Sequence, residues 1–386
     1  MTVKLQRATD DSSLFAVPGE QVSNGERRVL EEESFQSMIS LERKRSERSR
    51  KAFVLMLLDT GSSAASAKNG KVLRDIASAL LSCTREIDVT GWYKERSVLG
   101  VILTELPVAE KHSTIYTMLS RVTSTLKESL TFEQFNQITI SFYLFPDDWD
   151  DDRLQGPSNR TLYPDLTKRD EAHRSFRVIK RIMDIIGSLA ALILLSPVFL
   201  VIATAIKTTS KGPAFFRQRR IGQNGEPFIF LKFRSMFVGN DASIHRLYVK
   251  ELIAGHAEKQ ASGGNGEGVY KLTKDPRVTR VGAFLRKTSL DELPQFINVL
   301  KGEMSLVGPR PPLPYEVESY DIWHRRRLLE AKPGITGLWQ VNGRSRVTFD
   351  DMVRLDLQYA RTCSLWTDLR ILLRTPGAVI LGAGAH

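Results

Sequence analysis

The sequence predicts an α+β protein in which a small mixed domain precedes a larger, mostly helical domain that is attached to a membrane. Strand-like and helix-like segments alternate as β-α-β-β-α-β over residues 36–145. About 22 residues between Ile185 and Ile206 then carry no charge. The 386-residue length also fits two domains better than one.

The first domain is predicted to have the ferredoxin-like order of elements. Residues 1–35 are polar and aperiodic, so we expect them to be disordered. The elements expected over residues 36–145 are a helix at 36–51, a strand at 53–58, a helix at 72–82, a hairpin at 87–93 and 98–103, a helix at 113–130 and a strand at 137–144. The acidic stretch 146–170 is expected to be a linker, and residues 171–386 form the second domain.

The uncharged run is long enough to cross a bilayer core of about 30 Å. Pro197 interrupts it where its ring would bend a helix, and the Ser196 hydroxyl can satisfy a carbonyl freed there. Lys and Arg favour the cytoplasmic side, yet they crowd both flanks: Arg174, Arg177, Lys180 and Arg181 before the run, and Lys207, Lys211, Arg217, Arg219 and Arg220 after it. This favours a re-entrant helix over 178–207, with a kinked transmembrane helix and a buried core helix as alternatives.

The net charge of +11 is concentrated in the second domain. From Leu166 onward the chain carries 34 Lys and Arg against 20 Asp and Glu. Such a surplus beside an apolar segment indicates lipid headgroups, phosphate-bearing substrates or both. Nucleic acid is not expected, because no zinc, helix-turn-helix or RNA-binding fingerprint accompanies the charge. Two distant cysteines and an N-terminus without an apolar signal core predict a cytoplasmic location.

The adjacent carboxylates of Asp291 and Glu292 are the strongest candidates for chemistry. Four arginines lie near them in the sequence: Arg277, Arg280, Arg286 and Arg310. Phosphoryl transfer needs a nucleophile or metal ligand together with cations that balance the charge of the transferring group. Two structural alternatives stay open. Ser289 and Glu292 have the spacing of a helix capping box, and the charges could form a surface salt-bridge cluster.

The second domain resembles the bacterial sugar transferase family, which comprises the monotopic phosphoglycosyl transferases. The resemblance covers about Phe176 to Thr375 and rests on motifs in one order: Lys180-Arg181-x-x-Asp184, Ser196-Pro197, Phe216-Arg217-Gln218-x-Arg220-x-Gly222, Lys232-Phe233-Arg234-Ser235-Met236, Asp275-Pro276-Arg277, Asp291-Glu292-Leu293-Pro294-Gln295, Val307-Gly308-Pro309-Arg310-Pro311, Lys332-Pro333-Gly334-Ile335-Thr336-Gly337 and Trp339-Gln340-x-x-Gly343-Arg344. The later motifs are similar to those of the exopolysaccharide-type members.

This resemblance implies the transfer of a sugar-1-phosphate from a UDP-sugar to undecaprenyl phosphate, with release of UMP. Asp291 would be the nucleophile that forms a covalent phosphosugar intermediate, and Glu292 its partner in proton transfer or in binding Mg²⁺. Phosphate contacts would come from Arg234, Arg277, Arg280, Arg286 and Arg310. Lys180 and Arg181 would anchor the re-entrant helix at the cytoplasmic face of the bacterial inner membrane, among its lipids. A homodimer is a further expectation.

The first domain resembles the palm domain of GGDEF proteins and nucleotide cyclases. The hairpin that holds metal and nucleotide in that family reads Gly91-Trp92-Tyr93-Lys94-Glu95-Arg96-Ser97 here, without paired glycines or acids. We therefore expect a degenerate sensory or dimerising domain instead of a cyclase. The alternative function for the whole chain is a non-enzymatic membrane scaffold or sensor with a nucleotide-binding-like N-terminal domain.

Overall fold

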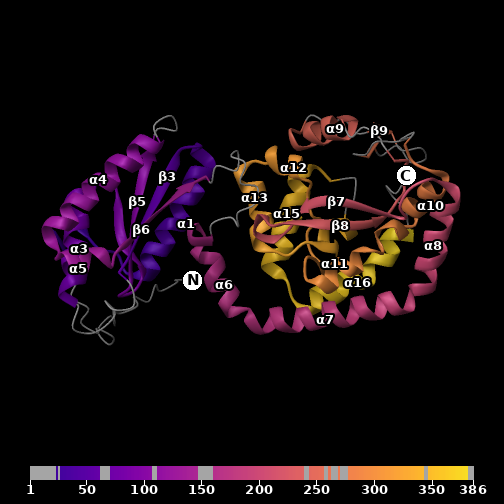
Figure 1. The fold of residues 1–386 in the computed structure, drawn as a ribbon, viewed down its shortest axis with the longest axis horizontal. Helices are drawn as coiled ribbons and strands as arrows, with labels where there is room; N and C mark the ends of the chain where they lie inside the picture. The colour runs from indigo at the N-terminus through magenta and orange to yellow at the C-terminus, as the bar shows by residue number, and fades with distance from the viewer. Residues whose placement is uncertain are drawn as a thin grey trace, which may run out of the picture. The chain divides into compact units, whose positions relative to one another are not determined.

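The computed structural model describes residues 23–24, 27–60, 70–106, 111–146, 160–238, 243–255, 260–261, 268–269, 277–342 and 347–380. Its contacts divide the chain after Phe145 into two units (Figure 1). Residues 1–22 of the segment expected to be disordered lie outside the described ranges. The expectation is wrong for the end of that segment, because helix α1 begins at Glu32. Leu30 already forms a bridge to Gly91.

The first unit has the predicted ferredoxin-like topology. Its four-stranded antiparallel sheet has the order β4-β5-β3-β6. Helices α3 and α4 lie on one face of this sheet and α1 on the other (Figure 1). The bounds are α1 (Glu32–Ser49), β3 (Ala52–Asp59), α3 (Gly70–Cys83), β4 (Val89–Lys94), β5 (Val98–Leu106), α4 (Lys111–Ser129), α5 (Phe132–Asn136) and β6 (Thr139–Phe145). The short helix α5 was not predicted.

Packing of α1 on the β4–β5 hairpin requires two glycines. The ring of Phe35 is fully buried against Gly91 and Gly100. A Cβ atom at either glycine would lie within 2.5 Å of that ring. Glycine at both positions therefore lets the helix approach the sheet closely, which closes this side of the core.

The second unit is mostly helical, as predicted. Its helices are α6 (Pro164–Ala172), α7 (Arg174–Leu194), α8 (Ser196–Thr209), α9 (Ser243–Ile253), α10 (Arg280–Lys287), α11 (Gln295–Lys301), α12 (Pro314–Glu318), α13 (Ile322–Glu330), α14 (Leu338–Asn342), α15 (Phe349–Thr362) and α16 (Leu365–Ile380). Residues 147–159 of the predicted linker lie outside the described ranges. Its last part is helical, with the 3₁₀ turn η3 (Arg160–Leu162) and α6, so the linker prediction was too long.

Small two-stranded sheets complete the second unit. Strands β7 (Phe215–Ile221) and β8 (Pro227–Phe233) form an antiparallel hairpin across the 3₁₀ turn η4 (Gln223–Gly225). Strands β11 (Ser305–Val307) and β12 (Gly334–Thr336) pair in parallel. The sequence predicts short strands or extended segments at 214–217 and 227–233, which agree with the first pair. For residues 332–337 it predicts a turn, so it does not predict β12. Two further short pairs are β1 (Ser23–Asn24) with β2 (Arg27–Arg28) in the first unit and β9 (Gln260–Ala261) with β10 (Gly268–Val269) in the second.

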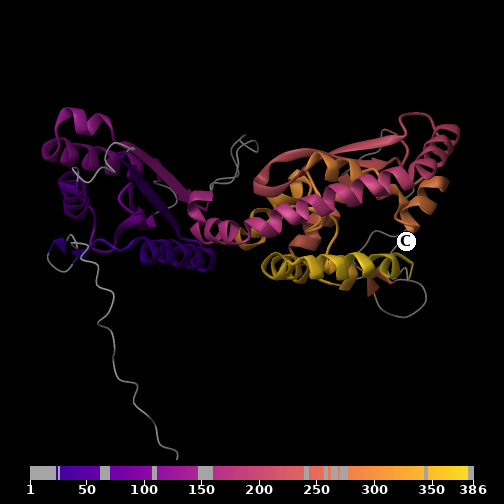
Figure 2. The same cartoon turned by 90° about the horizontal axis from the view of Figure 1, so that it is seen from below.

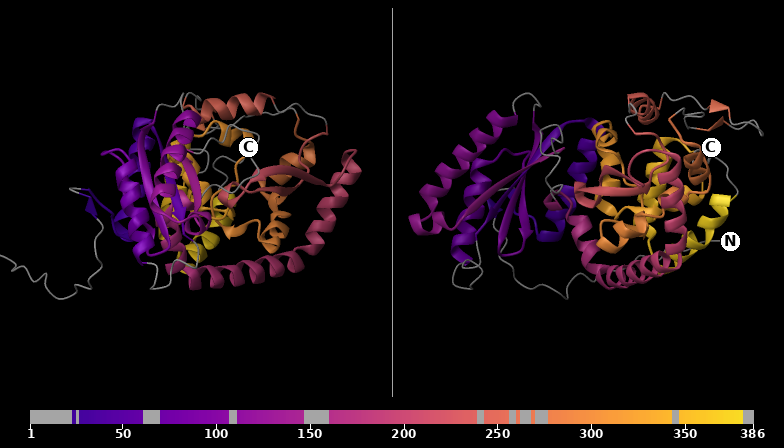
Figure 3. Two further views of the ribbon diagram at one scale, coloured as in Figure 1. Left: turned by 60° about the vertical axis from the view of Figure 1, so that its left-hand side comes forward. Right: turned by 45° about the vertical axis from the view of Figure 1, so that its right-hand side comes forward.

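Helices α7 and α8 meet at the predicted break. Their axes are bent by 60° at Leu195, and Pro197 stands in the first turn of α8. The Ser196 hydroxyl donates to the Ile193 carbonyl at 2.8 Å, which confirms its predicted role at the bend. The two helices border the second unit (Figures 2 and 3). In the described part of the chain no single helix has the length and apolar content of a bilayer span, but this bent pair has both together.

Polar contacts hold α7 against the rest of the second unit. Asp184 is buried and accepts hydrogen bonds from the Ser305 hydroxyl at 3.0 Å and the Leu306 N–H at 2.9 Å. Lys180 binds Asp368 and the Val307 carbonyl. These contacts fix α7 against β11 and α16.

Arg181 completes this docking by closing the end of another helix. Its guanidinium donates to the carbonyls of Val299 and Leu300, at the C-terminal end of α11. The sequence predicts that Lys180 and Arg181 anchor the chain to the membrane. The structure instead gives both side chains protein partners, because buried carbonyls and Asp368 need donors on this face of α7. They anchor the helix to its own unit.

The opposite faces of α7 and α8 are apolar and uncovered. Large aliphatic side chains there are half or more exposed: Ile186, Ile193, Leu194, Leu200 and Val201. A soluble helix would bury such a stripe against a partner. This surface is therefore consistent with the predicted contact with lipid, which stays a prediction.

If α7 and α8 enter a bilayer and return, cysteines introduced at Arg177 and Lys211 will react with an impermeant maleimide from the same side. A cysteine at Leu194, close to the bend, will resist the reagent from both sides. The measurement is labelling of right-side-out and inverted vesicles in a background without Cys83 and Cys363. Labelling of positions 177 and 211 from opposite sides would exclude the re-entrant arrangement.

Candidate active site

The Asp291-Glu292 pair lies in the 3₁₀ turn η5 (Leu290–Glu292) between α10 and α11. Ser289, directly before it, has φ 55° and ψ 17°, and its side chain makes no capping hydrogen bond. The capping-box interpretation is therefore wrong for this segment. Thr279 caps α10 instead, accepting from the Gly282 N–H at 2.9 Å. A left-handed Ser costs about 1 kcal/mol or more, and this sharp turn directs Asp291 inward, where it is 6% exposed.

Lys232 is the cation nearest to both carboxylates. Its Nζ lies 2.8 Å from Glu292 Oε1 and 3.8 Å from Asp291 Oδ2. The side chain extends from β8, over the ring of Phe230 at 5.4 Å. Lys232 was not predicted as a site residue, although it stands in the motif that contains Arg234. The available signal was that Lys232 and Arg234 are two positions apart, so that in an extended segment their side chains point to the same face. Which partners the two side chains bind depends on the rest of the fold.

Arg310 approaches the same pair from another segment. Its Nη1 lies 3.9 Å from Glu292 Oε1, and its side chain is 40% exposed. The segment Pro309-Arg310-Pro311 follows β11, and its proline rings restrict the backbone. Two buried arginines bind this backbone as well. Arg327 donates to the Arg310 carbonyl at 2.9 Å, and Arg220 donates to the Pro311 carbonyl at 2.7 Å.

Arg327 is itself held by a buried acid. Its guanidinium lies 2.7 Å from Asp356 Oδ2, and both side chains are almost completely buried. Burial is the largest single influence and would lower the pKa of Arg327, but Asp356, Tyr320 and Glu316 together outweigh it and raise that pKa. Burial raises the pKa of Asp356 to about 6, so this acid is still mostly ionised at neutral pH. Burial also lowers the pKa of Arg220 to about 10, well above neutrality. Both arginines are therefore cations that support the Arg310 segment.

Three glycines let the Arg310 segment cross β12 closely. Gly334 and Gly337 each lie close to the backbone of Gly308. A Cβ atom at Gly334 would lie 2.1 Å from the Gly308 nitrogen. The Gly308 N–H donates to the Thr336 carbonyl at 2.8 Å. The segment 332–337 therefore forms a strand that supports the site, where we expected a turn.

The two carboxyl groups differ in their acid strength. Burial raises the pKa of Asp291, and the neighbouring Glu292 adds to this, while Lys232 opposes both. Burial would also raise the pKa of Glu292, but Lys232 and then Arg310 outweigh it and hold that pKa at about 2. Glu292 is thus a permanent anion at neutral pH, paired with two cations. Asp291 is therefore the weaker acid of the two, and perturbed carboxyl groups are common at catalytic sites.

The remaining predicted arginines do not share one environment. Arg286, on α10, is exposed, and its charge lowers the pKa of Asp291. Arg280 is exposed at the start of α10, and the Arg277 carbonyl accepts a hydrogen bond from the Phe237 N–H. Arg234 is buried, and its guanidinium donates to the carbonyls of Lys211 and Ser210 and to the Ser210 hydroxyl.

These contacts do not support the prediction that Arg234 binds phosphate. Its donors instead satisfy carbonyls that follow the last turn of α8. The left-handed Gly212 leaves room for the guanidinium, since a Cβ atom there would lie 2.1 Å from Nη1. Arg234 therefore connects the α8 end to β8, whereas Arg310 and Arg286 remain candidates for phosphate contacts.

The dyad has the oxygen donors that Mg²⁺ prefers, but it provides few of them. Within the described ranges no group of three or more His, Cys, Asp or Glu side chains could hold a metal. Mg²⁺ is commonly held by one or two carboxylates, with the remaining positions taken by water and substrate phosphates. Asp291 and Glu292 fit that set, provided that Lys232 yields part of its contact with them.

Comparison with known proteins places this site in a family. The bacterial sugar transferase family matches residues 175–382, which is more than half of the chain. The chain belongs to the bacterial sugar transferase family. Exopolysaccharide production protein ExoY of Rhizobium meliloti is 42% identical over 210 residues, which are 54% of this chain and 88% of that protein.

Longer relatives match only in part. The UDP-glucose:undecaprenyl-phosphate glucose-1-phosphate transferase of Klebsiella pneumoniae is 46% identical over 206 residues, 51% of this sugar transferase chain and 39% of that protein. The chain spans less than half the length of several more curated relatives. A diguanylate cyclase protein from Thermotoga maritima covers 31% of this chain and 85% of its own, at 18% identity and a TM-score of 0.26. At that TM-score the likeness carries no argument, so the GGDEF resemblance stays a prediction.

Replacing Asp356 with Ala will destabilise the second unit, because Arg327 is left as an unpaired buried cation. We expect a loss of about 3 kcal/mol or more in the free energy of unfolding. Chemical denaturation of the purified protein in detergent measures it, with Asp351→Ala as the control, because that carboxylate is 49% exposed and its partner Arg354 is also exposed. The double variant Arg327→Met/Asp356→Leu should recover much of the loss. A cost below about 1 kcal/mol for Asp356→Ala would contradict the role of the pair.

Proposed function

We propose that this sugar transferase moves a sugar-1-phosphate from a UDP-sugar to undecaprenyl phosphate and releases UMP. The observation that carries the proposal is the pairing of the buried Asp291 with a Glu292 whose charge is already balanced by Lys232 and Arg310. A carboxylate nucleophile beside fixed cations is what displacement at a phosphorus atom requires. The name of the Klebsiella relative, a UDP-glucose:undecaprenyl-phosphate glucose-1-phosphate transferase, supports the substrate classes.

In the first proposed step an oxygen of Asp291 attacks the phosphorus atom that bears the sugar. The bond from this phosphorus to the bridging oxygen of the diphosphate breaks, and UMP leaves with that oxygen. A phosphosugar is then esterified to Asp291. Arg310 and Arg286 are placed to balance charge on the phosphates, and Lys232 keeps Glu292 ionised and in position.

In the second proposed step a phosphate oxygen of undecaprenyl phosphate attacks the same phosphorus atom. The bond to Asp291 breaks, the carboxylate is restored, and the sugar is joined to the lipid through a diphosphate. Bound at Asp291 and Glu292, Mg²⁺ would supply further positive charge to the phosphates. The apolar faces of α7 and α8 would keep the unit at the cytoplasmic face of the inner membrane, where the lipid phosphate is presented.

This step would begin an exopolysaccharide or a related glycan, a proposal supported by the name of the Rhizobium relative. A homodimer and a sensory or dimerising role of the first unit remain proposals of ours. The rival function, a non-enzymatic membrane scaffold or sensor, requires neither a buried nucleophile nor cations around it. The dyad geometry favours the enzyme.

Asp291→Asn will abolish UMP release from UDP-glucose or UDP-galactose in the presence of undecaprenyl phosphate. Without a covalent route the rate should fall by about 10⁴-fold or more. Coupled detection of UMP measures the rate, and Glu318→Gln at an exposed position serves as the control. Turnover of Asp291→Asn within about ten-fold of the unmodified enzyme would refute the nucleophile assignment.

Lys232→Met will shift the pH dependence of the first step. Asp291 attacks only when ionised, and Lys232 is the main group that lowers its pKa. Removing this cation raises the pKa, so the acid limb of single-turnover UMP release should move to higher pH. Lys250→Met, at an exposed position on α9, is the matched control. An acid limb that stays in place, whatever the loss in maximal rate, would show that Lys232 does not act on Asp291.

A further inference from the structure

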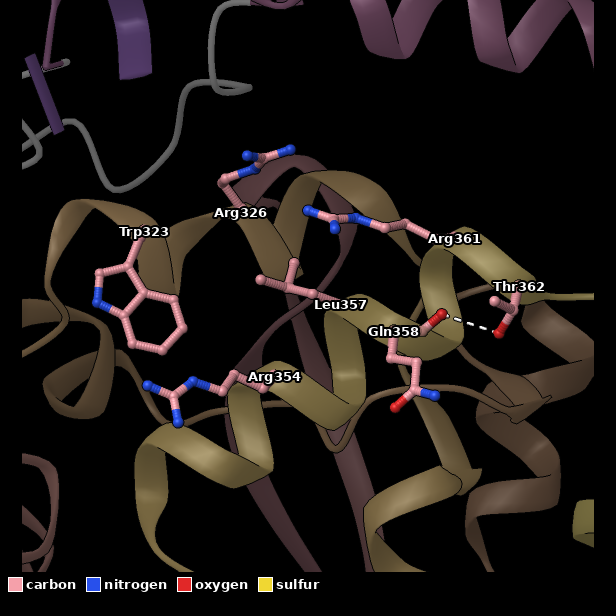
Figure 4. Close-up of a pocket in the computed structure, with 7 residues that line it drawn as sticks. All are labelled: Trp323, Arg326, Arg354, Leu357, Gln358, Arg361 and Thr362. Carbon is pink, nitrogen blue, oxygen red and sulfur yellow. Dashed lines mark hydrogen bonds between the residues drawn. The ribbon is translucent and has the colours of Figure 1, made fainter. Parts of the chain in front are cut away.

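A cavity in the second unit lies between α13 and α15, and none of the dyad-site residues lines it. Its volume is about 430 Å³, within the range of small-ligand sites. Three arginines surround it: Arg326 from α13, and Arg354 and Arg361 from α15 (Figure 4). Trp323 lines one side, and Leu357 lies at the centre of the view. None of these residues has a part in the reaction proposed above.

The cavity has more positive charge than its own contacts balance. Arg326 is paired with Glu330 at 2.7 Å, and Arg354 with Asp351 at 3.0 Å. Arg361 makes no ion pair with any other residue that the structure describes, and its side chain is exposed. Among the described residues, none that lines the cavity is acidic. A negatively charged ligand is therefore the kind that it suits.

The spacing of these groups indicates which class of anionic ligand would fit. Arg354 and Arg361 are seven residues apart on α15, which places them two turns, or about 10 Å, apart on one face. Guanidinium groups bind phosphate oxygens through two parallel hydrogen bonds. Trp323 offers an indole ring within reach, and the Arg354 guanidinium already lies 6.0 Å from its centroid. Aromatic rings of this kind stack with nucleobases.

We propose that this cavity, defined by Trp323, Arg326, Arg354, Leu357 and Arg361, is a nucleotide-binding site separate from the dyad. The phosphates are bound by Arg361 and Arg354, and the base packs against Trp323 and Leu357. Its charge comes from this chain's own arginines, so the site requires no metal. The proposal does not depend on the transferase reaction.

The test uses mant-ADP as the probe. Energy transfer from Trp323 to the mant group reports occupancy of the cavity, and anisotropy reports binding itself. Arg361→Ala should weaken binding by about ten-fold or more, because an exposed guanidinium is lost without harm to the fold. Trp323→Phe should abolish most of the energy transfer while leaving measurable binding.

The control is Arg370→Ala, which removes an arginine from α16 that lies over Trp366, outside the cavity. It should leave binding unchanged. The proposal is overturned if the probe fails to bind, if Arg361→Ala binds as tightly as the unmodified chain, or if pyrophosphate displaces the probe as well as ADP does. UMP release is measured in parallel on Arg361→Ala. If the unmodified chain binds the probe but releases no UMP, the transferase proposal is refuted and the nucleotide-site proposal is not.

Discussion

Burial of two adjacent carboxylates is the constraint on which the second unit depends. A buried anion without a partner costs several kcal/mol, so the fold must bring cations to Asp291 and Glu292. Lys232 arrives from the β7–β8 hairpin and Arg310 from the segment after β11. The hairpin, the parallel pair β11–β12 and the turn η5 thus meet at one charge cluster. Their mutual position follows from the need to balance it.

Hydrogen bonds from charged side chains to the backbone fix the bent helix pair to the site. Asp184 accepts a hydrogen bond from the Leu306 N–H, and Lys180 donates one to the carbonyl of Val307, the next residue in the strand. The strand that leads directly to Arg310 is therefore the strand that α7 binds. At the other end of the pair, Arg234 binds the residues after α8 while its neighbour Lys232, two positions earlier in the chain, reaches the dyad. A shift of α7 and α8 would therefore displace both Arg310 and Lys232.

Sequence patterns predicted most elements of the first unit and the bend at Ser196-Pro197, and they indicated Asp291 and Glu292 as candidates, because each of these inferences depends on neighbouring residues. They failed where the partner is distant. Lys232 and Glu292 are 60 residues apart in the chain, and nothing local distinguishes Lys232 from Arg234, whose partners proved to be carbonyls after α8. Ser289 fits a capping box by spacing, but its left-handed backbone turns the side chain away from that role. Strand β12 was missed because three residues paired to a remote strand leave no period to read.

The cavity and the dyad are connected by the two helices between them. Arg326 and Arg327 are consecutive on α13, and Asp356 and Leu357 are consecutive on α15, so each helix carries one residue of the cavity beside one of the buried ion pair. Arg327 of that pair donates to the carbonyl of Arg310, whose guanidinium lies 3.9 Å from Glu292 Oε1. A ligand that draws α13 and α15 together would also act on the Arg327–Asp356 ion pair, because each helix carries one member of that pair. Coupling between two sites requires a physical element that both can bias, and α13 and α15 are the elements that the cavity and the ion pair share.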